Sequence, residues 1–85
     1  MTREQIGTML YRYCMYQNYD VNQKGALTAY EDGHQVSEWA EEALSWASGI
    51  GIINGRDDGT LAPKAMASRA EIAAMLTRLG NIYIG

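Results

Sequence analysis

One stretch decides the fold: Ser68-Arg69-Ala70-Glu71-Ile72-Ala73-Ala74-Met75-Leu76-Thr77-Arg78. An earlier part of the chain repeats it, as Thr2-Arg3-Glu4-Gln5-Ile6-Gly7-Thr8-Met9-Leu10-Tyr11-Arg12. In register, Arg, Ile, Met, Leu and Arg are identical, while Thr stands for Ser and Gln for Glu. This agreement exceeds what a shared helical pattern supplies, so we interpret the two segments as copies of one unit.

The two copies predict two amphipathic helices with specified starts. At each start a hydroxyl residue precedes a Gln or Glu by three positions, which is the spacing of a capping box. Structural capping is therefore expected from Thr2, Gln5, Ser68 and Glu71. Apolar residues then recur at i, i+3, i+4 and i+7. They are Ile6, Met9, Leu10 and Tyr13 in the first helix and Ile72, Met75, Leu76 and Leu79 in the second.

A third helix is predicted after Ser37, with acids in its first turns and an end near Gly49. Its apolar stripe is Val36, Trp39, Ala40, Ala43, Leu44 and Ala47. Residues 18–35 are predicted to form a polar loop with a short extended piece from Leu27 to Tyr30, and residues 50–67 a tight loop that depends on glycine. The predicted fold is mainly α: helix, long loop, helix, glycine-rich loop, helix.

Length, charge and composition exclude several classes of protein. A chain of 85 residues with 47% apolar and 20% charged residues is typical of one small globular domain. The net charge of −3 argues against nucleic acid as a partner, and no apolar run approaches the roughly 20 residues that membrane insertion requires. The only cysteine, Cys14, cannot form an internal disulfide. Because the first residues lack the layout of a signal peptide, the chain is cytoplasmic or a piece of a longer exported protein, and the repeat favours the second.

Several motifs follow one another in a recognisable order. They are Leu27-Thr28-Ala29-Tyr30-Glu31-Asp32, Val36-Ser37-Glu38-Trp39-Ala40, Gly51-Ile52-Ile53-Asn54-Gly55, Asp58-Gly59-Thr60-Leu61-Ala62-Pro63 and Ser68-Arg69-Ala70-Glu71. This string resembles the S-layer homology family. The resemblance divides the chain into the closing helix of a preceding unit at 1–17, a linker loop at 18–26, and a complete unit with a short C-terminal tail at 27–85.

The resemblance implies a noncovalent anchoring module on the bacterial cell surface, outside the cell and part of a larger exported protein. In the family, tandem units pack as a pseudo-threefold helical spindle, and grooves between units hold secondary cell-wall polysaccharide, often with pyruvylated sugars. The glycan-binding residues expected on this basis are Arg69, Arg3, Trp39, Gly55 and Asp58. The alternative is a structural or self-assembly module that uses the same fold without binding glycan.

The residues themselves leave the roles of the arginines and tryptophans open. Arginine near the positive end of a helix dipole is mildly unfavourable, so its presence in both copies indicates a use, such as a bidentate grip on a carboxylate. The competing role is an intramolecular ion pair with an acid such as Asp32 or Asp58. A place in the apolar stripe favours burial of Trp39, whereas Trp46, close to two serines, fits the core and the surface equally.

A single unit with one extra helix should leave a helix face uncovered, because small cores supply little stability and exposed apolar patches usually mark an interface. We therefore expect self-association as a homo-oligomer. The residues expected at that contact are Met9, Tyr11, Tyr13, Tyr16 and Met75.

Catalysis and metal binding find little support. His34 is the only histidine and has no second histidine or cysteine near it in sequence, so metal or general-base chemistry is not expected. The loop from Asp20 to Glu31 matches much of the EF-hand template, but Lys24 stands where a ligating oxygen belongs. A calcium-dependent module is therefore the third-ranked hypothesis, and we expect no enzyme, no cofactor and no bound metal.

Overall fold

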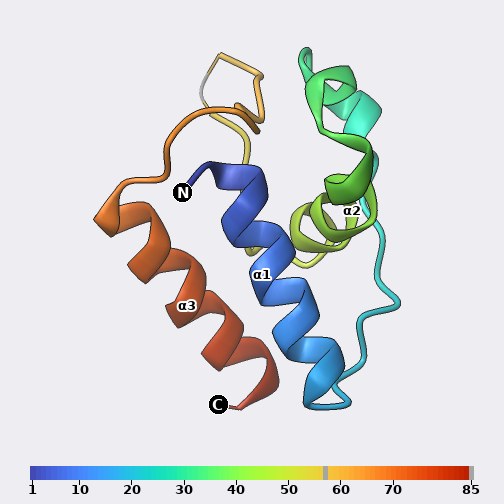
Figure 1. The fold of residues 1–85 in the computed structure, drawn as a ribbon, viewed down its shortest axis with the longest axis vertical. Coiled ribbons are helices and arrows are strands. Elements are labelled where there is room, and N and C mark those ends of the chain that lie inside the picture. The colour runs from blue at the N-terminus through green and yellow to red at the C-terminus, as the bar shows by residue number, and fades with distance from the viewer. Residues whose placement is uncertain (57, 85) are drawn as a thin grey trace.

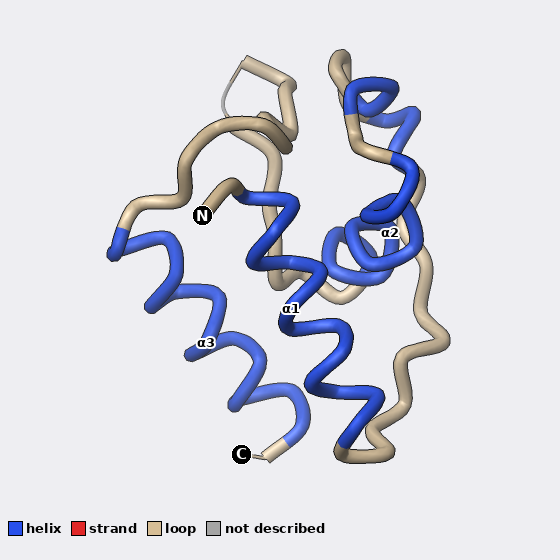
Figure 2. Tube along the Cα trace, in the orientation of Figure 1, coloured by secondary structure: helices blue, strands red, loops and turns tan. Residues whose placement is uncertain are grey.

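The computed structural model describes residues 1–56 and 58–84, so Asp57 in the glycine-rich loop and Gly85 lie outside the described residues. Within these residues, three α-helices carry the fold: α1 (Arg3–Tyr16), α2 (Glu41–Gly49) and α3 (Arg69–Tyr83). Three 3-10 helices of one turn each lie between α1 and α2, at Leu27–Ala29, Gly33–Gln35 and Glu38–Ala40. The mainly α fold predicted from the sequence is confirmed (Figure 2).

The central element is α1, with α2 on one side and α3 running beside it on the other (Figure 1). The segment that leads into α3 lies against the first residues of the chain. Thr2 and Met66 form an isolated antiparallel bridge, and the Arg3 amide donates to the Ala65 carbonyl at 2.8 Å. This bridge is the only β-structure in residues 1–56 and 58–84. The two repeat-related helices are therefore joined by side-chain packing and by this single bridge.

The hydrophobic core forms where α1, α2 and the loop after α2 meet. Ile6 of α1 is buried together with Trp46 of α2 and Ile53 of the loop. Gly7 permits this close approach, since a Cβ there would lie 2.8 Å from Leu44 and 3.0 Å from Ile53. A larger side chain at that position would force the Leu44 and Ile53 side chains to shift.

The two repeat copies bury different faces of the same pattern. Leu10 of α1 is 3% exposed, whereas its repeat equivalent in α3, Leu76, is 50% exposed. The reverse holds one residue earlier, where Met9 is 47% exposed and Met75 only 3%. The difference arises because α1 lies between two helices and α3 packs against one. The expectation that Met75 lies at an open contact surface is therefore wrong.

Two segments between the helices differ from the prediction. The piece from Leu27 to Tyr30 is not extended; Leu27–Ala29 forms a 3-10 turn, in which the Tyr30 amide donates to the Leu27 carbonyl at 3.1 Å. The helix predicted to follow Ser37 begins with the 3-10 turn Glu38–Ala40 and becomes α-helical only at Glu41. It ends at Gly49 as expected, but the left-handed conformation after it belongs to Gly51, with φ of 84°.

Aromatic residues fasten the end of α3 to the rest of the molecule. The Tyr83 hydroxyl accepts a hydrogen bond from Trp46 Nε1 at 3.1 Å and donates to the Asp20 carbonyl at 2.7 Å. Its ring stacks on Tyr19 with the ring centroids 4.9 Å apart. Tyr11 packs against Trp46 with the ring centroids 5.4 Å apart, so this half-buried residue belongs to the cluster. Its place at a contact between copies stays a prediction.

Candidate functional site

Arg3, the first residue of α1, is held by acceptors from two other segments. Its side chain is 7% exposed. Nε donates to the Leu61 carbonyl at 3.0 Å and Nη2 to the Asn54 carbonyl at 2.9 Å, both in the glycine-rich region. Nη1 forms an ion pair with the Glu71 carboxylate in the first turn of α3. Arg3 therefore joins α1, the loop and α3, and each guanidinium nitrogen is engaged by the protein.

Glu71 serves two purposes at once. One carboxylate oxygen accepts from the Ser68 amide at 3.1 Å while the Ser68 hydroxyl accepts from the Glu71 amide, so the pair forms a capping box. The other oxygen binds Arg3. The hydrogen bond from the Ser68 backbone, with the nearby Arg3 charge, lowers the pKa of Glu71 although partial burial opposes the shift. At the start of α1, Thr2 and Gln5 make the same reciprocal cap.

Neither acid suggested from the sequence pairs with an arginine. The Asp32 carboxylate accepts from the amides of Leu61 and Ala62 at 2.7 and 2.9 Å. Asp58 accepts from the Thr60 hydroxyl at 2.6 Å and from its amide at 3.1 Å, and these hydrogen bonds lower the pKa of Asp58. Both acids therefore shape the loop through its backbone. The intramolecular ion pair expected for the arginines does form at Arg3, but its acid is Glu71 and not Asp32 or Asp58.

A groove of about 530 Å³ lies beside Arg3, between α3 and the glycine-rich loop. Three arginines from three segments line it, together with one acid that is already paired with Arg3. The groove therefore has a local surplus of two positive charges in a chain whose net charge is −3. The lining residues are Arg3, Ile52, Ile53, Asn54, Gly55, Arg56, Ala70, Glu71, Ala74, Met75 and Arg78.

The arginines of this groove differ in the donors that they have left. Arg78 uses Nη1 to donate to the Ile52 carbonyl at 3.1 Å, and the remaining guanidinium N–H groups have no assigned acceptor in the described part of the chain. Arg56 is exposed, and the described residues supply no acceptor for its side chain. Arginine donors in this state bind carboxylate or phosphate in a bidentate way. Arg56 and Arg78 can therefore hold an anion, whereas Arg3 is committed.

The loop itself is tightly folded around Gly55. A Cβ at Gly55 would lie 2.5 Å from the Tyr30 ring, so the backbone passes directly over that ring. The Arg56 amide donates to the Thr60 carbonyl at 2.7 Å, and Gly59 adopts a φ of 82° that favours glycine. These contacts fix the backbone at Gly55 and Arg56, which both line the groove.

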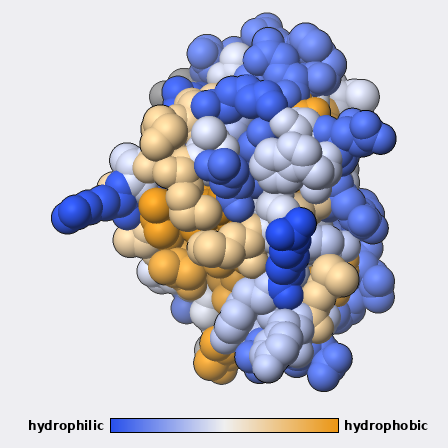
Figure 3. Space-filling view, in the orientation of Figure 1, coloured by the Kyte–Doolittle hydropathy of each residue, from blue (hydrophilic) through white to orange (hydrophobic). Residues whose placement is uncertain are grey.

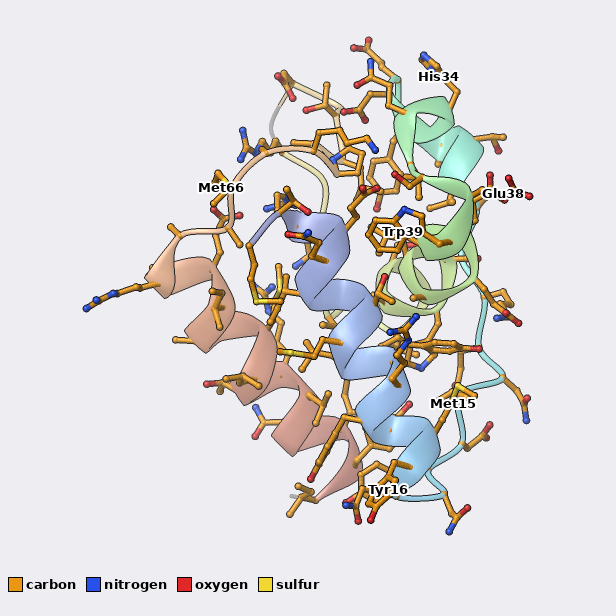
Figure 4. All side chains as sticks on the ribbon, in the orientation of Figure 1. Met15, Tyr16, His34, Glu38, Trp39 and Met66 are labelled. Carbon is orange, nitrogen blue, oxygen red and sulfur yellow. The ribbon has the colours of Figure 1, made fainter. Side chains whose placement is uncertain are left out.

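A second, smaller groove of about 290 Å³ contains Trp39. It is lined by Met1, Gln5, Thr8, Met9, Arg12 and Trp39. Its α1 residues are the repeat equivalents of Glu71, Ala74, Met75 and Arg78 in the larger groove. Equivalent positions of the two repeat helices therefore line two separate grooves, one on α3 and one on α1. The indole of Trp39 lies beside the groove on α1 (Figure 4).

The structure thus separates the residues expected to bind glycan. Arg3 and Gly55 lie together in the larger groove, and Trp39 lies in the smaller one. Asp58 lines neither groove. Arg69 is exposed, lines neither groove, and makes no hydrogen bond or ion pair with any described residue.

The structure contradicts the place expected for Trp39 and decides the place of Trp46, which the sequence had left open. Trp39 is 56% exposed, so its predicted burial is wrong, and Trp46 is fully buried in the core. The cause is the 3-10 turn at Glu38–Ala40, which advances about 120° per residue instead of the 100° of an α-helix. The side chain of Trp39 therefore leaves the apolar stripe that a continuous helix from Ser37 would have given it.

Arg56 and Arg78 were not among the residues expected at the site. A pattern for Arg78 was present, because it follows Glu71 by seven residues and so lies on the same helix face. Arg56 follows Gly55 directly in the loop motif. The sequence does not show that Arg56 and Arg78 line the same groove, because this depends on how the loop folds against α3.

No cluster of three or more metal-ligating side chains occurs in residues 1–56 and 58–84. In the loop that matches the EF-hand template, Asp20 accepts from the Asn22 amide at 3.0 Å and Lys24 lies over the Tyr11 ring. Among the described helices, none is long and apolar enough to span a bilayer.

Comparisons with known proteins agree with one another. The family model of the S-layer homology domain matches residues 29–73. Exoglucanase XynX of Acetivibrio thermocellus is 38% identical over 77 residues, which cover 89% of this chain and 7% of that protein. Amylopullulanase of Thermoanaerobacterium thermosulfurigenes is 37% identical over 87 residues, which cover 96% of this chain and 5% of that protein. The chain therefore spans less than a tenth of the length of these curated relatives. No solved structure gives a match.

Proposed function

The chain belongs to the S-layer homology family, and on that premise we propose that it is a noncovalent anchoring module that binds an acidic secondary polysaccharide of a bacterial cell wall. Membership of the family assigns the chain to the bacterial cell surface. The observation that supports glycan binding is the larger groove. Arg56 and Arg78 both line it, and each has guanidinium N–H groups without an acceptor among the described residues.

The chemistry of the groove suits a carboxylate carried by a sugar, such as a pyruvate ketal. A guanidinium matches the planar carboxylate through two parallel N–H···O bonds, and a groove with surplus positive charge raises the local concentration of an anionic polymer. Arg3 contributes by holding α1, the loop and α3 in register rather than by donating to the ligand. Gly55 lets the loop backbone pack closely against the Tyr30 ring, which fixes the loop where it lines the groove.

Trp39 has a separate part in this proposal. Its exposed indole beside Arg12, Gln5 and Thr8 offers a flat apolar surface with polar neighbours, on which a sugar ring stacks. Asp58 supports the site indirectly, because its hydrogen bonds with Thr60 hold the loop in shape.

Co-sedimentation with isolated Gram-positive cell walls tests the proposal. Intact walls should pellet the wild-type protein, and walls stripped of secondary polysaccharide should not. Arg56→Ala and Arg78→Ala should each weaken pelleting, while Arg69→Ala, which removes an equally charged residue outside the groove, should not. Circular dichroism establishes that each variant is folded. If Arg69→Ala abolishes pelleting and Arg56→Ala leaves it intact, the ligand is held at the start of α3 and not in the groove.

We propose that the chain itself is not catalytic. The relatives are named as enzymes, but the chain covers only 7% and 5% of their lengths. Three grooves formed by the described residues have neither paired acids across them nor a histidine in their lining. Their hydrolase activities are therefore left with the parts of those proteins outside this segment.

A second candidate function, self-assembly, is favoured by an apolar groove of about 430 Å³ between α1 and α3. It is lined by Met9, Leu10, Tyr13, Leu76, Leu79, Gly80 and Ile84. Apolar side chains also gather on the face shown in Figure 3. If a second copy covers this groove, sedimentation velocity should show a dimer that grows with protein concentration and that Tyr13→Lys disrupts. A monomer at every concentration would remove this candidate.

A further inference from the structure

Glu4, in the first turn of α1, carries a buried carboxylate and lines none of the three grooves described above. Its side chain is 4% exposed. Burial raises the pKa of Glu4, but hydrogen bonds from Ser37 and Lys64 outweigh this effect and keep the pKa below its ordinary value. The carboxylate is therefore ionised at neutral pH, and such a buried charge persists only where its oxygens are well paired.

The partners of Glu4 come from two segments outside α1. Oε1 accepts from the Ser37 amide at 2.9 Å, and Oε2 accepts from the Ser37 hydroxyl at 2.8 Å. Oε2 also forms an ion pair with Lys64 Nζ at 3.1 Å, and Lys64 in turn donates to the Ser37 hydroxyl. The Glu4 amide donates to the Pro63 carbonyl at 3.0 Å. Glu4 therefore ties the start of α1 to Ser37 and to the end of the glycine-rich loop.

Ser37 is the residue from which the 3-10 turn Glu38–Ala40 starts. A serine at a helix start usually caps the backbone with its own hydroxyl, but this hydroxyl makes no such bond and donates to Glu4 instead. At the other end of the turn, the Ala40 amide donates to the Ser37 carbonyl at 2.8 Å, and Ala40 is fully buried. The turn is thus fixed at one end by Glu4 and at the other by the core, with Trp39 between them.

The side chain of Trp39 lies beside α1 and forms part of the smaller groove (Figure 4). Because the residue is 56% exposed, packing in the core does not fix its indole. The contact at Ser37, two residues earlier, fixes the backbone from which the indole projects. Thr8 connects the two features, since it lines the groove of Trp39 and its hydroxyl donates to the Glu4 carbonyl at 2.8 Å.

The second repeat copy has no carboxylate at this position. The equivalent of Glu4 in α3 is Ala70, which is exposed and lines the larger groove. Helix α3 nevertheless has the same capping box as α1. Neither the helix nor its cap therefore requires an acid here, and the acid occurs in the copy whose groove contains an indole.

We propose that Glu4 is a positioning residue for Trp39, whose carboxylate holds the turn so that the indole forms one wall of the smaller groove. Glu4 then acts on a bound sugar only through Trp39. The consequence for binding rests on the proposed function, whereas the position of the indole is measurable without any glycan.

Acrylamide quenching of tryptophan fluorescence measures that position. Trp46 is fully buried, so the quencher reaches mainly Trp39. Glu4→Gln, which keeps the size of the side chain and removes its charge, should increase quenching and shift the emission to longer wavelength, because the indole leaves α1. Ser37→Ala should change both in the same direction. Glu38→Gln is the matched control, since it removes an exposed carboxylate from the same turn, and it should leave both unchanged.

Co-sedimentation with cell walls separates positioning from a general loss of stability. Glu4→Gln and Trp39→Ala should each weaken pelleting, and a protein with both changes should pellet as well as Trp39→Ala alone, because the two residues act through one contact. A further loss in the double variant would mean that Glu4 acts on the fold as a whole, and it would overturn the inference.

Unchanged quenching in the folded Glu4→Gln and Ser37→Ala variants would overturn it as well. Far-ultraviolet circular dichroism establishes folding, and Ser37→Ala decides the matter if Glu4→Gln does not fold. If the wild-type protein does not pellet with intact walls, the proposed function fails, and quenching alone still decides whether Glu4 positions Trp39.

Discussion

Replacing Arg3 with alanine should destabilise the protein by about 3 kcal/mol. A hydrogen bond to a charged group contributes roughly 1.5–3 kcal/mol, and the guanidinium makes three such contacts. The full sum overstates the loss, because the Glu71 side chain is 29% exposed and Asn54 is exposed, so water replaces part of what Arg3 supplied. The Leu61 carbonyl, on a fully buried residue, has no such replacement. Removal of one partner of a fully buried pair costs about 3–5 kcal/mol, and partial solvation places this case at the lower end.

A loss of this size removes most of the stability of so small a domain, since cores below about 80 residues supply roughly 3–5 kcal/mol. The midpoint of thermal unfolding should fall by roughly 12–24 °C, at about 4–8 °C per kcal/mol. Far-ultraviolet circular dichroism and the fluorescence of buried Trp46 measure it. Arg69→Ala is the matched control and should change the free energy of unfolding by less than about 0.5 kcal/mol. An Arg3→Ala variant within that same range would refute the view that Arg3 joins the three segments.

Two further predictions concern pH and the aromatic cluster. Hydrogen bonds from Ser68 and Arg3 lower the pKa of Glu71, and those from Ser37 and Lys64 lower the pKa of Glu4 against the opposing effect of burial. Because these folded-state values lie below the unfolded ones, their stabilisation is fully present above the ordinary glutamate pKa of about 4.3 and is lost as pH falls through the folded values. The urea concentration at the unfolding midpoint should stay constant above pH of about 4.3 and decrease at lower pH. In the Glu71→Gln variant this decrease should be smaller. A wild-type midpoint that rises on acidification would contradict the lowered pKa values of the two glutamates. Tyr83→Phe should cost about 1–3 kcal/mol in urea unfolding, because it leaves the buried Trp46 Nε1 without an acceptor, and an unchanged midpoint would show that the indole finds another one.

Local chemistry explains which features the sequence could predict. Capping boxes depend on residues three apart, and amphipathic stripes on residues within two turns, so the positions of α1 and α3 follow from short segments. The family follows from the order of several short motifs, which survives without knowledge of how they meet. These features need no information about distant parts of the chain.

The features that the sequence missed depend on contacts between distant residues. Arg3 and Glu71 are separated by 68 positions, and only the folded loop and helices bring them together. The exposure of Trp39 depends on a short 3-10 turn, whose start is fixed in turn by Glu4 accepting from the Ser37 amide at 2.9 Å. The larger groove likewise exists only because Arg56 in a loop and Arg78 in a helix end on the same side.

The contacts of α1 also fix the order in which the molecule can form. The first helix is made first, yet its arginine binds partners 51, 58 and 68 positions later in the chain. Loop closure over such separations is slow compared with the formation of a helix. The chain therefore reaches its native packing only when nearly all of it is available, and a growing or partly translocated chain lacks the acceptors for Arg3. Arg3 therefore gains its full set of acceptors only after the start of α3, the last of the three segments, has been made.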